Sequence, residues 1–281
     1  DEAGLVQTPV YPPILRASKT TCILHQEMAL NLNADGSYGL DIDLFERSFT
    51  DQTRLFILCN PHNPVGKVYC QDDLERIAAV CLRHQVIICS DEIHAELLFS
   101  GQRHIPIAAL DPEIAQHTIT LIAPSKTFNI AGLHCSLAVI QNPDLRKKYL
   151  DARKGLMSGV NVLGLTAALA AYQEGDDWLQ QVLQYLENNR DYLYELVINE
   201  FDGVKMAKPE GTYLAWLDCR EAGECVSENP HKFFLEYARV ALNDGLDFGH
   251  NGSGFLRLNF ACPHQTLASA LKAMRDALRN G

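Results

Sequence analysis

The sequence of 281 residues predicts an α/β protein with a large three-layer αβα domain, built on a mostly parallel sheet, followed by a smaller α+β domain. Two observations predict this. Between residues 20 and 140, short apolar runs alternate with helical patterns, which is typical of a parallel sheet with crossover helices. After residue 143 the pattern changes to long helices with a few separated strands. We place the boundary between residues 1–175 and 176–281, where a long amphipathic stretch begins.

The first part contains five strand-like runs and one clear helix between the second and third of them. The helix has apolar residues at i, i+3, i+4, i+7 and i+8, beginning at Leu74, with Asp72 and Asp73 at its start and Arg83 near its end. A strand, a helix and another strand in succession predict a right-handed parallel unit. The predicted strands are Thr21–His25, Arg54–Cys59, Gln85–Cys89, Thr118–Ile122 and Ser136–Ile140. Before them, residues 5–11 are typical of a strand that runs into a turn.

The second part begins with helices and ends with an alternation of strands and helices. A polar stretch, Glu221–Asn229, predicts a loop. The predicted helices are Pro143–Leu156, Val160–Tyr172, Asp176–Asn199, Pro230–Leu242 and a last one from His264, and the predicted strands are Gly211–Leu217 and Phe255–Phe260.

Composition excludes several classes of protein. The net charge of −11 disfavours a nucleic-acid-binding surface. The nine cysteines include no C-x-x-C pair, which argues against a zinc site or a disulfide framework and favours a reducing cytoplasm. No apolar run is long enough to span a bilayer, and residues 1–4 do not resemble a signal peptide. We expect no membrane and no nucleic-acid partner, and we expect the chain to lack upstream sequence.

Three polar residues follow apolar strands and are the strongest candidates for chemistry. Asn63 follows the second strand, Asp91 ends the third, and Lys126 follows the fourth. Ligands of open parallel sheets bind beyond the carboxyl ends of the strands, so all three side chains are expected in one crevice. This set suits pyridoxal 5′-phosphate (PLP): a lysine amine forms a Schiff base, an acid pairs with the pyridine nitrogen, and an amide donates to the ring oxygen. Taken singly, each residue also fits an ordinary surface, cap or turn position.

Four more residues extend this candidate site. Tyr11, held between prolines, either covers the face of the cofactor or packs in a loop. His94 either supports Asp91 or forms ordinary hydrogen bonds, and Ser125 is a candidate for bonding the phosphate. Arg257 lies in an apolar strand and needs a partner, which is either a substrate α-carboxylate or a structural salt bridge. A metal site from Asp91, His94, Glu96 and His104 matches no standard spacing, so we expect no metal.

Several motifs in a fixed order extend over nearly the whole chain. They are Gln7–Pro13, Asn60–Gly66, Ser90–His94, Ser125–Leu133, Pro209–Asp218 and Arg257–Pro263. The chain thereby resembles fold-type I PLP enzymes of the aminotransferase class I/II superfamily, and within them the MalY/PatB-like cystathionine β-lyase branch. The resemblance implies a large PLP-binding domain and a smaller domain that begins with an interdomain helix.

The resemblance also implies a role for each candidate residue. Lys126 resembles the Schiff-base lysine, Asp91 the partner of the pyridine nitrogen, and Asn63 the donor to the ring oxygen. Tyr11 resembles the stacking aromatic, and Arg257 the carboxylate-binding arginine. His94 stands where many aminotransferases have a tyrosine. Ala123 and His134 stand where many relatives have a phosphate-binding serine and arginine, which leaves Ser125 as the candidate there.

The activity implied by the resemblance is that of a carbon–sulfur β-lyase. It eliminates a thiol from an S-substituted L-cysteine, such as cystathionine or a related small amino acid, and yields pyruvate and ammonia. An aminotransferase, and a non-catalytic fragment or regulatory homologue, remain the alternatives. Family members are usually homodimers and carry upstream residues that contribute a phosphate loop. Without such residues, we expect exposed apolar surface at Leu5–Leu15 and Val160–Leu169.

Overall fold

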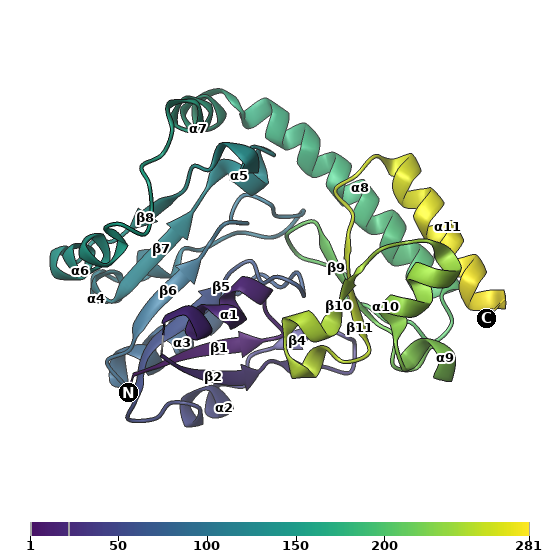
Figure 1. Ribbon diagram of the computed structural model, residues 1–281, viewed down its shortest axis with the longest axis horizontal. Coiled ribbons are helices and arrows are strands. Elements are labelled where there is room, and N and C mark those ends of the chain that lie inside the picture. Colours follow the sequence, from purple (N-terminus) through teal and green to yellow (C-terminus); the bar gives the residue numbers. More distant parts are fainter. Residues whose placement is uncertain (1, 22, 281) are drawn as a thin grey trace.

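The computed structural model describes residues 2–21 and 23–280 and contains a six-stranded sheet with helices around it (Figure 1). The strand order is β2-β1-β5-β6-β7-β8, and all neighbouring strands are parallel except β7 and β8. The bounds are β1 Ala3–Thr8, β2 Leu24–Ala29, β5 Thr53–Cys59, β6 Ile87–Asp91, β7 Thr118–Ile122 and β8 Leu137–Val139. The predicted α/β class with a mostly parallel sheet is therefore confirmed.

The alternation of side chains along β1 and β5 separates the two faces of this sheet. Leu5 and Phe56 pack in one apolar cluster with residues of α3, whereas Val6 and Ile57 pack in another cluster with residues of α1. Because successive strand residues point to opposite faces, helices cover both faces and the sheet forms the middle of three layers. The helices of this part are α1 Pro12–Thr21, α2 Ile42–Arg47, α3 Gln71–Arg83, α4 Pro112–Gln116, α5 Pro124–Thr127, α6 Pro143–Arg153 and α7 Val162–Glu174.

The smaller part of the chain has its own apolar cluster, which lies around an antiparallel sheet of order β10-β11-β9 and packs against two long helices. The bounds are β9 Leu214–Asp218, β10 Asn243–Asp244, β11 Phe255–Asn259, α8 Asp176–Glu200, α9 Glu224–Ser227, α10 Pro230–Phe233 and α11 His264–Asn280. Leu97 and Phe99, from the segment after β6, also pack into this cluster. A short two-stranded ribbon, β3 Asn31–Leu32 with β4 Tyr38–Gly39, pairs with neither sheet but packs against the small sheet through Tyr38 and Trp216.

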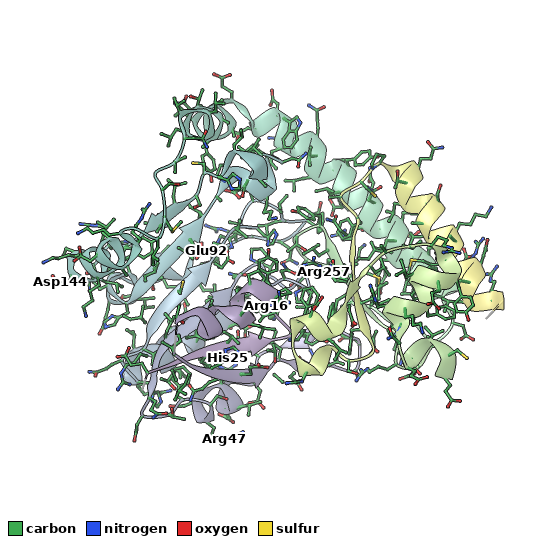
Figure 2. All side chains as sticks on the ribbon, viewed as in Figure 1. Arg16, His25, Arg47, Glu92, Asp144 and Arg257 are labelled. Atoms are coloured by element: carbon green, nitrogen blue, oxygen red, sulfur yellow. The ribbon has the colours of Figure 1, made fainter. Side chains whose placement is uncertain are left out.

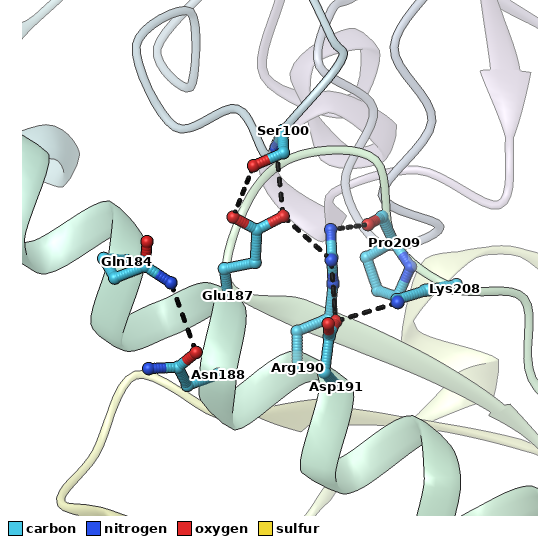
Figure 3. A network of polar contacts seen from close by, with 8 residues as sticks. All are labelled: Ser100, Gln184, Glu187, Asn188, Arg190, Asp191, Lys208 and Pro209. Carbon is cyan, nitrogen blue, oxygen red and sulfur yellow. Dashed lines mark hydrogen bonds and ion pairs between the residues drawn. The ribbon is translucent and has the colours of Figure 1, made fainter.

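A network of polar contacts joins the segment after β6 to α8 (Figure 3). The Ser100 backbone N–H and hydroxyl donate to the Glu187 carboxylate, at 3.0 and 2.8 Å. Arg190 donates to Glu187 at 3.0 Å and to the Pro209 carbonyl at 3.3 Å. Its guanidinium also lies 4.4 Å from the ring centre of Phe99. The loop that follows β6 is thereby fixed against the helix.

Several predicted bounds differ from the structure for local backbone reasons. The strand predicted from Gln85 begins at Ile87, because Gln85 has a φ of 54° that a strand does not tolerate. The helix predicted at Pro230–Leu242 is α10, which continues as a π-helical segment, Phe234–Ala238, and ends there because Arg239 has a φ of 59°. The strand predicted at Thr21–His25 begins at Leu24, since helix α1, which the prediction omitted, extends to Thr21. Position 22 of that strand lies outside the described residues. Pro12 begins α1, a position that proline favours.

The exposure predicted for apolar surface is correct in one place and wrong in another. On α7, Leu163 and Leu169 are 67% and 58% exposed. By contrast Leu5 and Val10 are buried, because β1 is an interior strand of the sheet. Within residues 2–21 and 23–280, no helix combines the length and the apolar character needed to cross a membrane.

Candidate active site

Asp91, Asn63 and Lys126 lie at the carboxyl ends of three adjacent parallel strands. Asp91 is the last residue of β6, Asn63 follows β5, and Lys126 lies in the short helix α5 that follows β7. The turn that carries Asn63 is tied to the end of β6, since the Asn60 backbone N–H donates to the Asp91 carbonyl at 3.0 Å. The order of the strands thus gathers at one edge of the sheet three residues that are far apart in sequence.

Asp91 is a largely buried carboxyl group beside a cation. Burial raises the pKa of Asp91 above its ordinary value, while the hydrogen bond from the Ile93 backbone N–H and the charge of Lys126 act in the opposite direction. The Ile93 nitrogen lies 3.2 Å from Oδ1. A cationic N–H group brought to this carboxylate would therefore be strongly favoured, because burial makes an unpaired charge costly.

Asn63 and Arg257 form a direct contact between the two parts of the chain. Arg257 extends from β11 toward the large sheet (Figure 2), and its Nη1 donates to Asn63 Oδ1 at 3.0 Å. With the carbonyl oxygen engaged, the amide group of Asn63 is oriented to donate elsewhere. The other contacts of Arg257 are with Asn243 Oδ1, at 2.8 and 3.3 Å, and with the ring of Phe248, at 4.8 Å.

His94 is buried and has a ring nitrogen with no partner. Its exposed fraction is 4%, and no hydrogen bond to Nδ1 occurs among the described residues. Burial, with the charges of Lys126 and Arg257, lowers the pKa of His94 to about 4, so the ring is neutral at neutral pH. No hydrogen bond joins His94 to Asp91 in the described part of the chain; the ring packs edge-on against Tyr213 instead.

Two cavities adjoin these residues, and they have different linings. One of about 870 Å³ is lined by Asp91, Ala123 and His134, together with residues of β8 and α6. The other, of about 420 Å³, is lined by Lys126 and Ser125, by Tyr213 and by residues of α8. The structure thus places Ser125 in the second cavity and away from the one that Asp91 lines. Tyr11, at the start of α1, is 37% exposed and acts electrostatically on Arg257.

Sequence analysis missed two features of this region. Tyr213 lines a cavity with Lys126 and packs against His94, and the sequence signals were its place in the predicted strand Gly211–Leu217 and in the motif Pro209–Asp218. Glu92 is buried on the opposite side of β6 from Asp91, where it accepts hydrogen bonds from Ser90 Oγ and pairs with His104 Nε2, both at 2.8 Å. That pairing joins residues of different segments, so spacing alone could not reveal it.

Comparisons with known proteins identify the family to which this fold belongs. Residues 3–274 match the family model "Aminotransferase class I and II". The chain is 38% identical, over 98% of its length, to cystathionine beta-lyase PatB of Bacillus subtilis, and covers 71% of that relative. The crystal structure of OvoB superposes with a TM-score of 0.94 at 42% identity, over 100% of this chain and 72% of that one.

A second solved structure is similar over a comparable share of its chain. The crystal structure of a PLP-bound C–S lyase from Staphylococcus hominis superposes with a TM-score of 0.94 at 34% identity, covering 100% of this chain and 73% of that one. Both the family model and these relatives match almost the whole of the described fold. On this evidence, the chain belongs to the aminotransferase class I and II family.

Proposed function

We propose that this chain is a PLP-dependent carbon–sulfur β-lyase that acts on an S-substituted L-cysteine. The observation that carries the proposal is the meeting of Asp91, Asn63 and Lys126 at one sheet edge, with Arg257 bonded to Asn63 from the other part of the chain. Relatives named as a cystathionine beta-lyase and as a C–S lyase support the choice of reaction. The products are a thiol, pyruvate and ammonia.

The residues present fit PLP. The buried Asp91 carboxylate suits the protonated pyridine nitrogen, the amide of Asn63 suits the ring oxygen, and the unpartnered Nδ1 of His94 is available beside them. Lys126 is the residue that would hold the cofactor covalently. When bound, PLP supplies an electron sink for the charge that develops at the substrate α-carbon.

Each residue then has a defined task. Arg257 binds the substrate α-carboxylate through paired N–H donors, which orients the α-carbon toward Lys126. The Lys126 amine would take the α-proton of the substrate at Nζ. The Asp91 carboxylate would pair with the ring nitrogen of the cofactor and favour its protonated form. The β-carbon–sulfur bond breaks with its electron pair leaving on sulfur, and water completes the conversion to pyruvate and ammonia.

The proposal includes the remaining expectations for the site and the chain. Tyr11 covers the face of the cofactor and Ser125 assists near the phosphate. The division into residues 1–175 and 176–281 is supported by the separate apolar clusters and by the start of α8 at Asp176. A homodimer is supported by the exposed leucines of α7. A cytoplasmic location is supported by the described cysteines, which are all free.

An aminotransferase is the second candidate, because the matched family model carries that name and the same residues serve both reactions. The discriminating experiment incubates the protein with PLP and either L-cystathionine or S-methyl-L-cysteine, without a keto acid, and measures pyruvate. A lyase releases pyruvate under these conditions. An aminotransferase releases none until a keto acid is added, and then forms a new amino acid.

Two variants assign the residues, and one serves as control. Lys126→Ala should abolish both pyruvate release and the borohydride-reducible attachment of PLP. Asp91→Asn should keep the attachment and lose most turnover, because an amide does not hold the ring nitrogen protonated. Lys147→Ala, an exposed lysine on α6, should match the unmodified protein. A borohydride-stable adduct in Lys126→Ala would refute the assignment of the lysine.

A further inference from the structure

Tyr213 lies at the centre of the candidate site although no role has been assigned to it. It directly precedes β9 and lines the cavity that Lys126 also lines. Its ring packs edge-on against His94, with ring centres 5.9 Å apart and planes at 89°. The side chain of Tyr213, next to the small sheet, therefore contacts His94 and shares a cavity with Lys126, both of which follow strands of the large sheet.

The backbone before Tyr213 adopts an unfavourable conformation that its neighbours enforce. Thr212, a β-branched residue, has a φ of 68°, in the left-handed region. Its N–H donates to the Leu97 carbonyl at 2.7 Å, and its Oγ1 accepts from the Leu214 N–H at 3.1 Å. The Tyr213 carbonyl accepts from the Phe260 N–H at 3.0 Å. Such an outlier persists only where surrounding contacts impose it, and it commonly marks a residue placed for function.

Two glycines allow this segment to pass close to the large sheet. The N–H groups of Glu210 and Gly211 both donate to the Gly66 carbonyl, at 2.9 and 3.1 Å. A Cβ on Gly66 would lie 2.7 Å from the Cβ of Pro209, and one on Gly211 would lie 3.0 Å from the Leu97 carbonyl oxygen. The approach is thus too close for side chains at these positions. Tyr213 is positioned by contacts with the turn that carries Asn63.

The electrostatic surroundings make the Tyr213 hydroxyl a neutral hydrogen-bond donor. Burial raises the pKa of Tyr213, the charge of Arg257 lowers it, and Tyr11 raises it, with a net rise. The phenol therefore keeps its proton at neutral pH. Arg257 forms hydrogen bonds with neutral amide side chains, and among the described residues it has no ion pair with a carboxylate. Tyr213 and Arg257 influence each other's pKa, and Tyr213 lines the cavity that Lys126 also lines. An amino acid bound near Lys126 with its carboxylate toward Arg257 would therefore lie beside Tyr213.

We propose that Tyr213 is a substrate-binding residue whose hydroxyl donates a hydrogen bond to the substrate α-carboxylate, beside Arg257. This inference rests on the proposed anchoring of that carboxylate. It does not depend on elimination, because any amino acid that bonds to the cofactor through its amine presents the same group. A hydrogen bond to a charged group of this kind strengthens binding by roughly tenfold or more.

The test uses the PLP-loaded protein and two amines that have no β-leaving group. L-Alanine carries an α-carboxylate and ethylamine does not, and the binding of each is followed by the change in cofactor absorbance. Tyr213→Phe should weaken L-alanine binding about tenfold. It should leave ethylamine binding within about twofold, since the ring and its packing on His94 remain. Tyr237→Phe, at an exposed tyrosine, is the matched control and should change neither.

Two results would overturn the inference. Unchanged L-alanine binding in Tyr213→Phe would mean that the hydroxyl does not touch the carboxylate. Equal weakening of both amines would mean that the residue acts through general packing. Failure of the proposed lyase function is seen separately: the protein would release no pyruvate, while discrimination between L-alanine and ethylamine would still depend on Tyr213.

Discussion

The buried Arg190 and the half-buried Arg257 have different kinds of hydrogen-bond partner. Arg190, on α8, pairs with the carboxylates of Glu187 and Asp191 at 3.0 and 2.6 Å (Figure 3). Arg257, on β11, has two asparagine carbonyls as its hydrogen-bond acceptors, and within the described chain it forms no ion pair. Burial accordingly lowers the pKa of Arg257, although nearby tyrosines and Asp247 partly oppose the shift.

The difference shows how one residue type serves two purposes. A buried charge that is paired with carboxylates of the same protein is already neutralised in the folded state, and removing it would destabilise the fold. A half-buried charge held by neutral amides is oriented but not neutralised, so a carboxylate from outside gains a strong partner without displacing an internal one. The first arrangement stabilises the fold and the second prepares a site. Four measurements test this difference between Arg190 and Arg257 and the groups that surround them.

The largest effect is expected for Arg190→Met. The substitution leaves Glu187 without its cation and Asp191 with only Lys208, so the free energy of unfolding should fall by about 3–5 kcal/mol. Urea unfolding followed by circular dichroism measures it. Arg16→Met, at an exposed arginine with a 3.8 Å ion pair, should cost less than about 1 kcal/mol. If Arg190→Met lowers the free energy of unfolding no more than Arg16→Met does, Arg190 does not stabilise the fold in the way described.

Arg257→Met should give the reverse pattern. The free energy of unfolding should change by less than about 1.5 kcal/mol, because only hydrogen bonds to neutral amides are lost. Binding of L-alanine to the PLP-loaded protein should weaken by about 2–4 kcal/mol. Both quantities are measured on the same preparation. A variant with a much lower free energy of unfolding but normal L-alanine binding would show that Arg257 stabilises the fold through its asparagine partners and does not bind the carboxylate.

The next prediction concerns the pH dependence of stability that arises from His94, whose buried ring is neutral at neutral pH. Its pKa is about 4 in the folded protein, below its ordinary value near 6.5. The unfolded chain therefore binds this proton first, and the folded state loses stability as pH falls from about 6.5 toward 4, with no penalty above that window. Between pH 6.5 and 5 the penalty approaches about 2 kcal/mol. His94→Gln should lose less stability over this interval than the unmodified protein, measured by urea unfolding at each pH.

The smallest effect is expected for Ser100→Ala. Partial burial tends to raise the pKa of Glu187, but the hydrogen bonds from Ser100 and the nearby Arg190 outweigh it and hold the pKa below its ordinary value. Stability from this group is thus complete above about pH 4.3 and is lost as pH falls through the lower folded pKa. The variant should cost about 1 kcal/mol at pH 7 and less at pH 3. Ser269→Ala, exposed on α11, is the control.

Much of the fold follows from local rules, and the core of the site follows with it. The apolar face of α3 and the placement of Asp91, Asn63 and Lys126 depend on periodicity and on strand direction, which a sequence displays directly. Helix α1 was missed because Pro12 was interpreted as part of a turn. Tyr213 and the Glu92–His104 pair were missed because contacts between distant segments define them. Distances along the chain say nothing about such contacts.

The bond between Arg257 and Asn63 joins residues 194 positions apart, and Trp216 bonds Tyr38 across 178 positions. During synthesis the strands β1 to β7 leave the ribosome long before Arg257 does, so the large sheet forms while one wall of the site does not yet exist. Closing contacts of such separation costs chain entropy and slows folding. The contact of Arg257 with Asn63 is therefore expected to be among the last to form, and a nascent chain contains Asp91 and Lys126 before it contains the residue proposed to bind the substrate carboxylate.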